Sequence, residues 1–470
     1  MFSGPMRRQE TATRKSLEDT IAAVSTPPGE GGIGIVRISG PSAIPIAAAL
    51  FRPASSNGVV KTRGRVQYGH VVTAQGAVVD EVLLHVMRAP HSYTREDVVE
   101  INCHGGAGPL NAVLDQVLTG GARLAEPGEF TQRAFLNGRI DLVQAEAVID
   151  TIRARTQASL RAAAAAASGT LSRDIGLVKT TLIDALARVE AAVDFPDEDL
   201  PELVDLALRE AIEGARDRMQ ALLDTADAGR LYREGAGMAI AGRPNVGKSS
   251  LFNALLRDSR AIVSAVPGTT RDRIEEIITL AGVPVRITDT AGLRDTHDAV
   301  EQLGVKIARD AVQNADFVLL VLDAAVAGPE DETLATELDA LERPVWVAWN
   351  KIDLAPSAAP PTWVGRFAGC TPVSAITGDG LNDLEEALGK LLLGSTPISP
   401  EHGLISRAHQ RDSLRRAAAA VTRLLENFSA SPEFLAADLR EALDALGEIT
   451  GETTPEDILA TIFSSFCIGK

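Results

Sequence analysis

Short hydrophobic runs alternate with glycine-rich turns in the first part of the chain. The clearest runs are Ile33–Ile38, Val66–Val72, Val82–Val86 and Val98–Asn102. Runs of this length, rich in valine and isoleucine and bounded by turn-forming residues, are typical of β-strands. We therefore expect an α+β domain over residues 19–139.

The pattern changes near residue 140 to one rich in alanine, leucine, glutamate and arginine. Five hydrophobic residues recur there at helical spacing: Leu208, Ile212, Ala215, Met219 and Leu222. This spacing places them on one face of an amphipathic helix. The helical pattern stops near Tyr232 and resumes near Arg407. The simplest arrangement is one all-α domain made of residues 140–234 and 400–470, with a separate α/β domain at 235–399 inserted between its halves.

The length of 470 residues fits about three domains. No hydrophobic run approaches the roughly 20 residues that a membrane-spanning helix needs, so we expect no membrane contact. Residues 1–18 are polar and basic, which favours a flexible extension over a short targeting peptide. The three cysteines, Cys103, Cys370 and Cys467, include no CxxC pair. That pattern is typical of a reducing, cytoplasmic location.

The formal net charge is −17, which argues against a polyanionic partner because phosphate contacts draw on lysine and arginine. The charge is uneven. Residues 1–140 hold 14 basic and 12 acidic side chains, so the negative charge lies after residue 140. A nucleic acid must therefore meet a local basic patch or a second protein.

Residues Gly242–Ser249 form a complete GxxxxGKS loop, between an apolar strand and a helix expected to begin at Ser250. The glycines allow backbone N–H groups to surround phosphates, and Lys248 reaches the terminal phosphates. The Ser249 hydroxyl is a ligand for Mg²⁺. Many ATPases share this motif, so alone it does not identify the nucleotide.

Further motifs follow in the order of a Ras-type domain. A hydroxyl of Thr269–Thr270, expected from Thr270, completes the Mg²⁺ shell. Asp289 supports the metal, and the Gly292 N–H reaches the γ-phosphate. In Asn350–Asp353 the last carboxylate accepts two hydrogen bonds from guanine, which adenine cannot offer. The set predicts GTP as the nucleotide, with these contact residues: Asn245, Val246, Gly247, Lys248, Ser249, Ser250, Thr269, Thr270, Asp289, Thr290, Ala291, Gly292, Asn350, Lys351, Asp353, Ser374 and Ala375.

The glutamine that orients water in Ras-like hydrolysis is missing, because Leu293 stands just after the Asp289–Gly292 motif. Leucine cannot hold water by a hydrogen bond, so another polar group must do so. The downstream candidates are Arg294, Asp295, Asp298 and Glu301, most of which are expected to be solvated loop charges.

Both ends of the chain carry unusual sequence. Thr26–Gly40 contains Pro-Pro-Gly and a dense glycine run, which suits either a turn-rich β-domain or a ligand loop. The chain ends in Cys467–Lys470, CIGK, after the apolar run Ile458–Phe466. The cysteine is either a buried thiol or a reactive one. Gly469 breaks the pattern of a prenylation signal.

Several of these segments together resemble the MnmE family of tRNA modification GTPases, also called TrmE. They are Asp19–Gly40, Ser92–Gly106, Pro127–Gly138, the inserted GTP-binding domain and the terminal CIGK. The resemblance runs from Asp19 to Lys470 and is specific to one family. In the second segment Arg95 stands where the family commonly has glycine.

The resemblance implies an N-terminal folate-binding domain that also forms a constitutive homodimer. With the FAD-containing protein MnmG, in a heterotetramer, the family adds an aminomethyl or carboxymethylaminomethyl group to C5 of the wobble uridine of tRNAs. The one-carbon unit comes from 5-formyl- or 5,10-methylene-tetrahydrofolate. The folate-contacting positions fall on Arg37, Glu100, Arg139 and Lys470, and Cys467 becomes a candidate catalytic thiol.

The resemblance also implies a GTPase activated by K⁺ and by dimerisation of its GTP-binding domains. The K⁺ positions fall on Asn245, Ser264, Val266 and Thr269, which the resemblance also counts among the nucleotide-binding residues, and Glu301 becomes the water-positioning acid.

Two rival functions remain. One is a regulatory GTPase of ribosome assembly, although no basic GxxG clamp for RNA follows the nucleotide domain. The other is a folate enzyme whose GTPase domain is not used, which the intact nucleotide motifs disfavour.

Overall fold

The computed structural model describes residues 19–54, 66–194, 205–258, 276–289, 312, 315–394 and 398–469. The chain forms two compact units, Met1–Ile149 with Thr450–Lys470, and Asp150–Ile449. This division is coarser than the five segments expected from the sequence, whose boundaries stay predictions.

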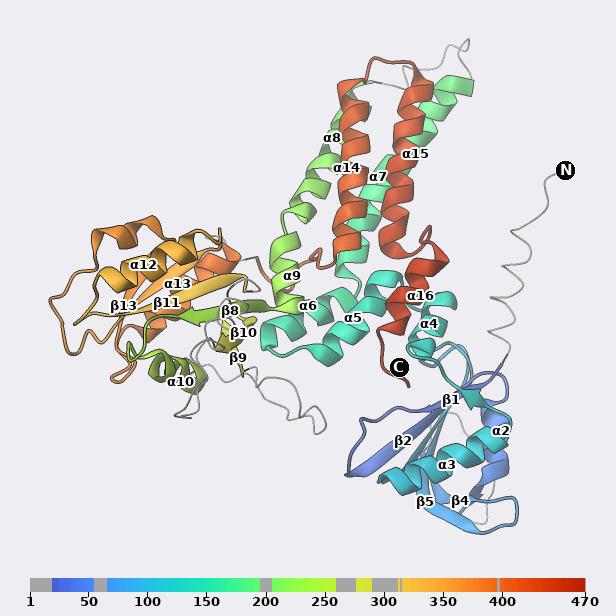
Figure 1. Ribbon diagram of the computed structural model, residues 1–470. Helices are drawn as coiled ribbons and strands as arrows, with labels where there is room; N and C mark the ends of the chain where they lie inside the picture. The colour runs from blue at the N-terminus through green and yellow to red at the C-terminus, as the bar shows by residue number, and fades with distance from the viewer. Residues whose placement is uncertain are drawn as a thin grey trace. The chain divides into compact units, whose positions relative to one another are not determined.

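A seven-stranded sheet forms the core of the first unit, in the order β3-β4-β5-β6-β2-β1-β7. Its strands are β1 Ile21–Val24, β2 Gly31–Ser39, β3 Phe51–Pro53, β4 Val66–Val72, β5 Val78–Met87, β6 Val98–Gly105 and β7 Arg123–Leu124. Helices α2 (Ala43–Leu50) and α3 (Ala107–Thr119) pack against this sheet (Figure 1). All four strands expected from the sequence are present.

Side chains along β2 and β6 point alternately into the hydrophobic core and to the opposite face of the sheet. Val36 and Ile38 are fully buried in the core shared with α2 and α3. Arg37 lies between them in sequence and therefore points to the opposite face. The antiparallel register pairs Arg37 with Glu100 of β6. Two charged residues far apart in sequence thus become direct neighbours on the face opposite α2 and α3.

The turn before β6 carries the one departure from the family pattern noted above. Arg95 has φ +60°, a left-handed conformation that glycine adopts without strain. Its guanidinium donates to the Asn137 carbonyl at 3.0 Å, and the Asn137 amide donates to the Thr94 carbonyl at 2.7 Å. The loop keeps the geometry that glycine would give it, and the arginine adds a bond to the turn after α4 (Glu129–Leu136).

The C-terminal segment of the described chain packs within this unit. Helices α5 (Leu142–Arg153) and α16 (Glu456–Ser464) join α4 around an aromatic core that includes Phe463 and Phe466. Beyond α16, Ile468 forms an antiparallel bridge with Pro127. The last residues therefore lie against the N-terminal sheet domain, as the red end of the ribbon shows (Figure 1).

The second unit contains long helices that run side by side (Figure 1). They are α7 Thr170–Asp194, α8 Leu206–Leu223, α14 Ala408–Glu426 and α15 Pro432–Thr450, and the shorter α6 Gln157–Ala167 contacts α7 and the short α9 Ala226–Glu234. All five residues expected on the apolar face of α8 are buried. The two helical stretches pack together, since α14 contacts α8.

The inserted domain has a six-stranded sheet in the order β13-β12-β11-β8-β10-β9, in which only β9 is antiparallel. The strands are β8 Ala236–Ala241, β9 Glu276–Leu280, β10 Val283–Asp289, β11 Phe317–Asp323, β12 Val345–Asn350 and β13 Gly369–Val373. The helices are α10 Lys248–Asp258, α12 Pro329–Asp339, the 3₁₀ turn η1 Thr362–Arg366 and α13 Leu381–Leu393. Hydrophobic cores lie on both faces of the sheet, so this is a doubly covered α/β fold.

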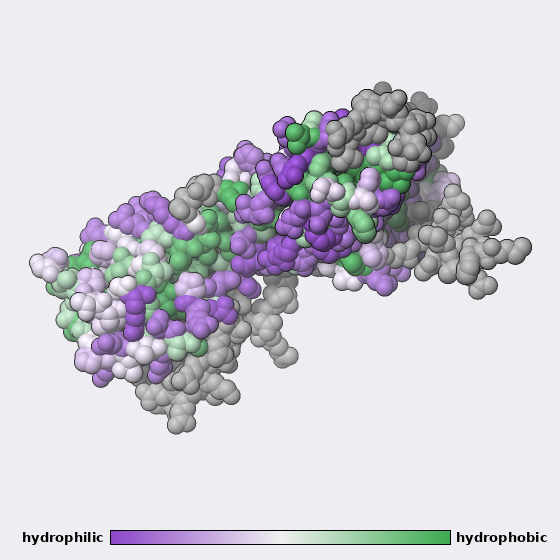
Figure 2. Space-filling model, turned by 90° about the horizontal axis from the view of Figure 1, so that it is seen from above, coloured by the Kyte–Doolittle hydropathy of each residue, from purple (hydrophilic) through white to green (hydrophobic). Residues whose placement is uncertain are grey.

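The fold class expected from the sequence is confirmed: an α+β domain, helices from two stretches and an inserted α/β domain. No helix in the described part of the chain is long and apolar enough to cross a membrane. Figure 2 shows hydrophilic and hydrophobic residues interspersed over the face in view.

Candidate functional site

The phosphate loop runs from the end of β8 into α10, at the carboxyl edge of the parallel strands, where ligands bind in folds of this kind. Two of its glycines cannot be replaced without moving their neighbours. A Cβ on Gly242 would lie 2.5 Å from the Val321 carbonyl, and one on Gly247 would lie 2.4 Å from the Asn350 amide nitrogen. The loop is therefore packed directly against β11 and the base-recognition motif.

Lys248 begins α10, two residues before the start expected from the sequence. Its ammonium donates to the carbonyls of Gly242 at 2.8 Å and Arg243 at 2.7 Å, inside the loop. Ser249 and Ser250 follow in the first turn of α10 and are exposed. A helix N-terminus with a lysine and a hydroxyl at this position suits a polyphosphate with its metal ion.

The base-recognition residues meet at the ends of β12 and β13. The Asn350 amide donates to the Val246 carbonyl at 2.9 Å, and its oxygen accepts from the Ala375 N–H at 3.1 Å. The Ser374 hydroxyl donates to the Asp353 carboxylate at 2.6 Å. Asp353 itself is exposed and has a second oxygen that this bond does not use. Such a held carboxylate is suited to accept guanine's two N–H donors.

Asp323 is a member of this cluster that the sequence analysis missed. It ends β11, and its carboxylate contacts the Lys351 ammonium at 2.6 Å. The same ammonium donates to the Asn245 carbonyl at 2.7 Å. Lys351 thereby links the base motif to the phosphate loop. The available signal was a carboxylate closing a fully apolar strand, FVLLVLD.

The remaining nucleotide and ion positions lie outside the described residues. They are Ser264, Val266, Thr269, Thr270, Thr290, Ala291, Gly292 and Glu301, with Lys470 at the chain end. Asp289 ends β10 as expected, and only its backbone is described. Their assigned roles stay predictions. Among the described residues, no group of three or more His, Cys, Asp or Glu side chains is placed to hold a metal ion.

A second polar site lies on the face of the N-terminal sheet opposite α2 and α3, where the Phe130 ring of α4 lies 5.7 Å from the Arg37 guanidinium. Arg37 and Glu100 form an ion pair of 2.8 Å with side-chain exposures of 17% and 19%. The Arg139 guanidinium lies 4.7 Å from the centre of the Tyr93 ring, and that of Arg37 lies 5.7 Å from the same centre. Two of the four expected folate positions thus lie at one ring, which the sequence analysis did not single out, and Glu100 joins them through its ion pair with Arg37. The aromatic ring and the half-buried charges suit a flat, polar heterocycle.

The tail reaches the same site. The Arg37 guanidinium donates to the Gly469 carbonyl at 3.2 Å while it pairs with Glu100. Cys467 is exposed, in contrast to the buried Cys103. The reading of Cys467 as a buried structural thiol is therefore wrong.

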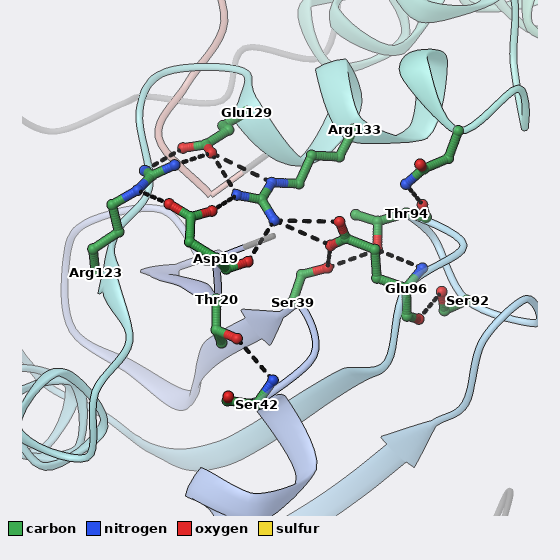
Figure 3. Close-up of polar contacts among 11 residues, drawn as sticks. Asp19, Thr20, Ser39, Ser42, Ser92, Thr94, Glu96, Arg123, Glu129 and Arg133 are labelled. Atoms are coloured by element: carbon green, nitrogen blue, oxygen red, sulfur yellow. Dashed lines mark hydrogen bonds and ion pairs between the residues drawn. The ribbon is translucent and has the colours of Figure 1, made fainter. Parts of the chain in front are cut away.

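Behind this site, a buried ion network holds the domain together (Figure 3). Arg133 of α4 is 1% exposed, and its guanidinium contacts Asp19 at 2.5 Å, Glu129 at 2.9 Å and Glu96 at 3.2 Å. Arg123 of β7 bridges Asp19 and Glu129, at 2.6 Å to each. The network ties the start of β1, the turn before β6, β7 and α4 into one rigid support.

The network sets the acidity of its own members. Burial alone would raise the pKa of Glu129, but the hydrogen bonds from Arg123, the Glu126 N–H and Arg133 outweigh it and hold that pKa below the ordinary value. Asp19 has a lowered pKa for the same reason, with burial opposed by bonds from Arg123 and Arg133. Both carboxylates stay ionised at neutral pH, which the buried cation requires.

The fold and the nucleotide cluster define a P-loop guanine-nucleotide-binding domain carried by a larger multidomain chain. A model of the MnmE helical domain matches residues 142–467, and a model of the GTP-binding protein TrmE N-terminus matches residues 20–139.

Relatives that match nearly the whole chain carry the same family name as the two domain models. The tRNA modification GTPase MnmE of Chloroflexus aurantiacus is 49% identical over 461 residues, covering 97% of this chain and all of the relative. That of Geobacter metallireducens is 48% identical, with the same coverage. The solved G domain of the T. maritima FeoB iron transporter is 31% identical and covers 33% of this chain and 96% of its own; its TM-score of 0.25 adds no weight. The chain belongs to the MnmE family of tRNA modification GTPases, so the resemblance found in the motifs is confirmed.

Proposed function

We propose that this protein is a K⁺-activated GTPase that acts in tRNA modification. With a FAD-containing partner of the MnmG type, it adds an aminomethyl or carboxymethylaminomethyl group to C5 of the wobble uridine. The one-carbon unit comes from a tetrahydrofolate bound at the N-terminal site. The observation that carries the proposal is the meeting of Arg37, Glu100 and the CIGK tail in one site, on a chain with a complete guanine-recognition motif.

The nucleotide half of the proposal follows from the geometry around α10 and β12. Asp353 recognises guanine, and Lys248 neutralises charge on the terminal phosphates. Asn350 and Lys351 hold the base-recognition motif against the phosphate loop through hydrogen bonds to its carbonyls. Water attacks the γ-phosphorus as the bond to the bridging oxygen breaks, giving GDP and phosphate. Bound Mg²⁺, held by Ser249 and Thr270, supplies neutralisation of phosphate charge.

Two further roles are assigned mainly to residues outside the described ranges, with Asn245 of the phosphate loop as the described member. K⁺ at Asn245, Ser264, Val266 and Thr269 supplies the positive charge that an arginine finger gives other GTPases. Glu301 orients the attacking water in place of the missing glutamine. Leu293 supports both assignments, because a leucine supplies neither charge nor a hydrogen bond to water.

In the folate half of the proposal, Glu100 accepts hydrogen bonds from the pteridine, and Arg37, Arg139 and Lys470 bind its polar edge and the carboxylate tail. Cys467 is the nucleophile of the later chemical step. The protein works in the cytoplasm as a homodimer and in a heterotetramer with the flavoprotein.

One pair of measurements tests both halves. Titration calorimetry with 5-formyl-tetrahydrofolate should show binding that Glu100→Gln weakens and that the matched surface change Glu81→Gln leaves alone. A regulatory GTPase of ribosome assembly would bind GTP and show no folate signal. GTP turnover should fall sharply when Na⁺ replaces K⁺ at equal ionic strength, and Asn245→Ala should erase that difference. Equal wild-type rates in the two salts would exclude the K⁺ role.

A further inference from the structure

The carbonyl of Gly469 is held by two side chains from the other end of the chain. The Ser25 hydroxyl donates to it at 3.1 Å and the Arg37 guanidinium at 3.2 Å. Ser25 directly follows β1, and its own N–H donates to the Ile35 carbonyl at 2.8 Å. The donor is therefore fixed by the sheet, and one tail atom receives two bonds from a rigid support.

The two residues before Gly469 are anchored through their backbones. Ile468 forms its antiparallel bridge with Pro127, and the Gly128 N–H donates to the Cys467 carbonyl at 3.3 Å. Three successive tail residues are thus each tied to the N-terminal domain. Short terminal segments fray unless they are tied down in this way.

Two glycines make this close approach possible. Gly469 has φ +92°, and a Cβ there would lie 2.2 Å from the Val24 carbonyl. Gly128 has φ +70°, and a Cβ there would lie 2.5 Å from the Phe463 carbonyl. Neither contact can be relieved by turning a side chain, because both atoms belong to the backbone. A methyl group at either position must displace the tail or the strand beside it.

The anchored tail leaves Cys467 exposed, two residues before the glycine whose carbonyl Arg37 binds. Arg37 contacts the Glu100 carboxylate and the Gly469 carbonyl at once. One guanidinium therefore joins the proposed ligand-binding acid to the segment that carries the thiol.

We propose that Ser25 is a positioning residue and that Ser25, Arg37, Gly128 and Gly469 form a tail seat that fixes Cys467 at the N-terminal site. The seat holds the backbone on both sides of the cysteine, so the thiol is presented in one geometry. The role of the seat in chemistry rests on the proposed function. The existence of the seat does not depend on the proposed function, because anchoring of the tail can be measured without any substrate.

Hydrogen–deuterium exchange on the full chain tests the anchoring. In Ser25→Ala, the Gly128 amide and the tail amides should exchange about fivefold faster, as expected for losing one hydrogen bond of about 1 kcal/mol. Gly469→Ala should speed amide exchange by more than this factor. Ser25→Thr, which keeps the hydroxyl, should retain most of the wild-type protection. The control is Ser464→Ala, whose exposed hydroxyl bonds only within its own helix, to the Thr461 carbonyl at 2.8 Å. Exchange at the wild-type rate in both Ser25→Ala and Gly469→Ala would overturn the proposal.

Kinetics test the positioning role. Ser25→Ala should lower kcat of tRNA modification about fivefold or more and raise KM for the folate by a smaller factor, because the loosened tail carries Lys470 as well as Cys467. A raised KM at unchanged kcat would overturn the positioning role. If the wild-type protein neither binds folate nor supports modification, the proposed function fails, whereas the exchange result still decides the seat. A thermal unfolding curve for each variant separates a loosened tail from a misfolded domain.

Discussion

The nucleotide site and the N-terminal site each present a carboxylate held by a neighbouring donor, but they hold it differently. Asp353 is exposed and receives one bond from the neutral Ser374 hydroxyl. Glu100 is largely buried and pairs with the Arg37 cation. The first carboxylate keeps its charge for the ligand, whereas the second shares its charge with an arginine that also holds the tail.

The two sites also differ in how much of the chain they need. The described nucleotide residues lie within one inserted domain and hold one another through a parallel sheet. The N-terminal site needs partners 432 and 444 residues apart. A substitution in the tail or its seat can therefore disturb the N-terminal site without touching the nucleotide residues. The comparison predicts that the two activities can be separated by mutation.

The largest expected separation comes from Cys467→Ser. This variant should abolish tRNA modification and leave GTP turnover within about twofold, because the thiol serves only the later step. Both activities are measured on one preparation. Cys370→Ser is the control, since burial raises the pKa of the Cys370 thiol to about 11 and makes it a poor nucleophile. Normal modification by Cys467→Ser would remove the cysteine from the mechanism, and joint loss of both activities would indicate a packing role.

Arg133→Met should lower the free energy of unfolding of the N-terminal unit by about 3–5 kcal/mol. It removes the cation while Asp19, Glu96 and Glu129 stay buried or half-buried. Denaturant unfolding checks this. The control Arg423→Met removes an exposed arginine paired with Asp438 and Glu441, and should cost at most about 1 kcal/mol. Equal losses in the two variants would mean that burial of the network does not matter.

Asp353→Asn should cost about 2–4 kcal/mol of GTP affinity, because an amide nitrogen faces guanine's donors in place of an oxygen. Xanthosine triphosphate should gain what GTP loses, and 5-formyl-tetrahydrofolate binding should not change. Calorimetry with the three ligands checks all of this, with the exposed Asp383→Asn at the start of α13 as the control. If Asp353→Asn bound GTP with wild-type affinity, the assignment of Asp353 to guanine recognition would be wrong.

The smallest effect is expected when the pH is lowered and the stability of the N-terminal unit is measured. The pKa of Glu129 in the folded chain lies below its ordinary value of 4.5, so its stabilisation is present above that pH and is lost as pH falls through the folded pKa. The unfolding free energy of the N-terminal unit should therefore decline below about pH 4.5, and less steeply in Glu129→Gln. Unfolding curves from pH 7 to pH 3 provide the measurement. Equal slopes in the two proteins would show that Glu129 is not the titrating group.

Local patterns in the sequence were sufficient for much of the structure. The spacing of Leu208, Ile212 and Met219 predicted a buried helix face, and all three are buried. The motifs around Gly242–Ser249 and Asn350–Asp353 predicted a nucleotide domain with its contacts at strand ends, as the β8 and β12 boundaries show. These signals work because side-chain period and turn chemistry depend on neighbours in sequence.

Only the tertiary structure brought Asp323 to Lys351, Tyr93 to Arg139 and Ser25 to Gly469. No local pattern specifies these pairs, because each depends on how strands and chain ends pack across long sequence separations. The sequence by itself determined the elements, the family and the nucleotide class. The fold decided which carboxylates are held by which donors. It also placed the last described residues of the chain beside the first strand, because α16 packs against α4 and α5 and the residues after it bond to Pro127 and Ser25.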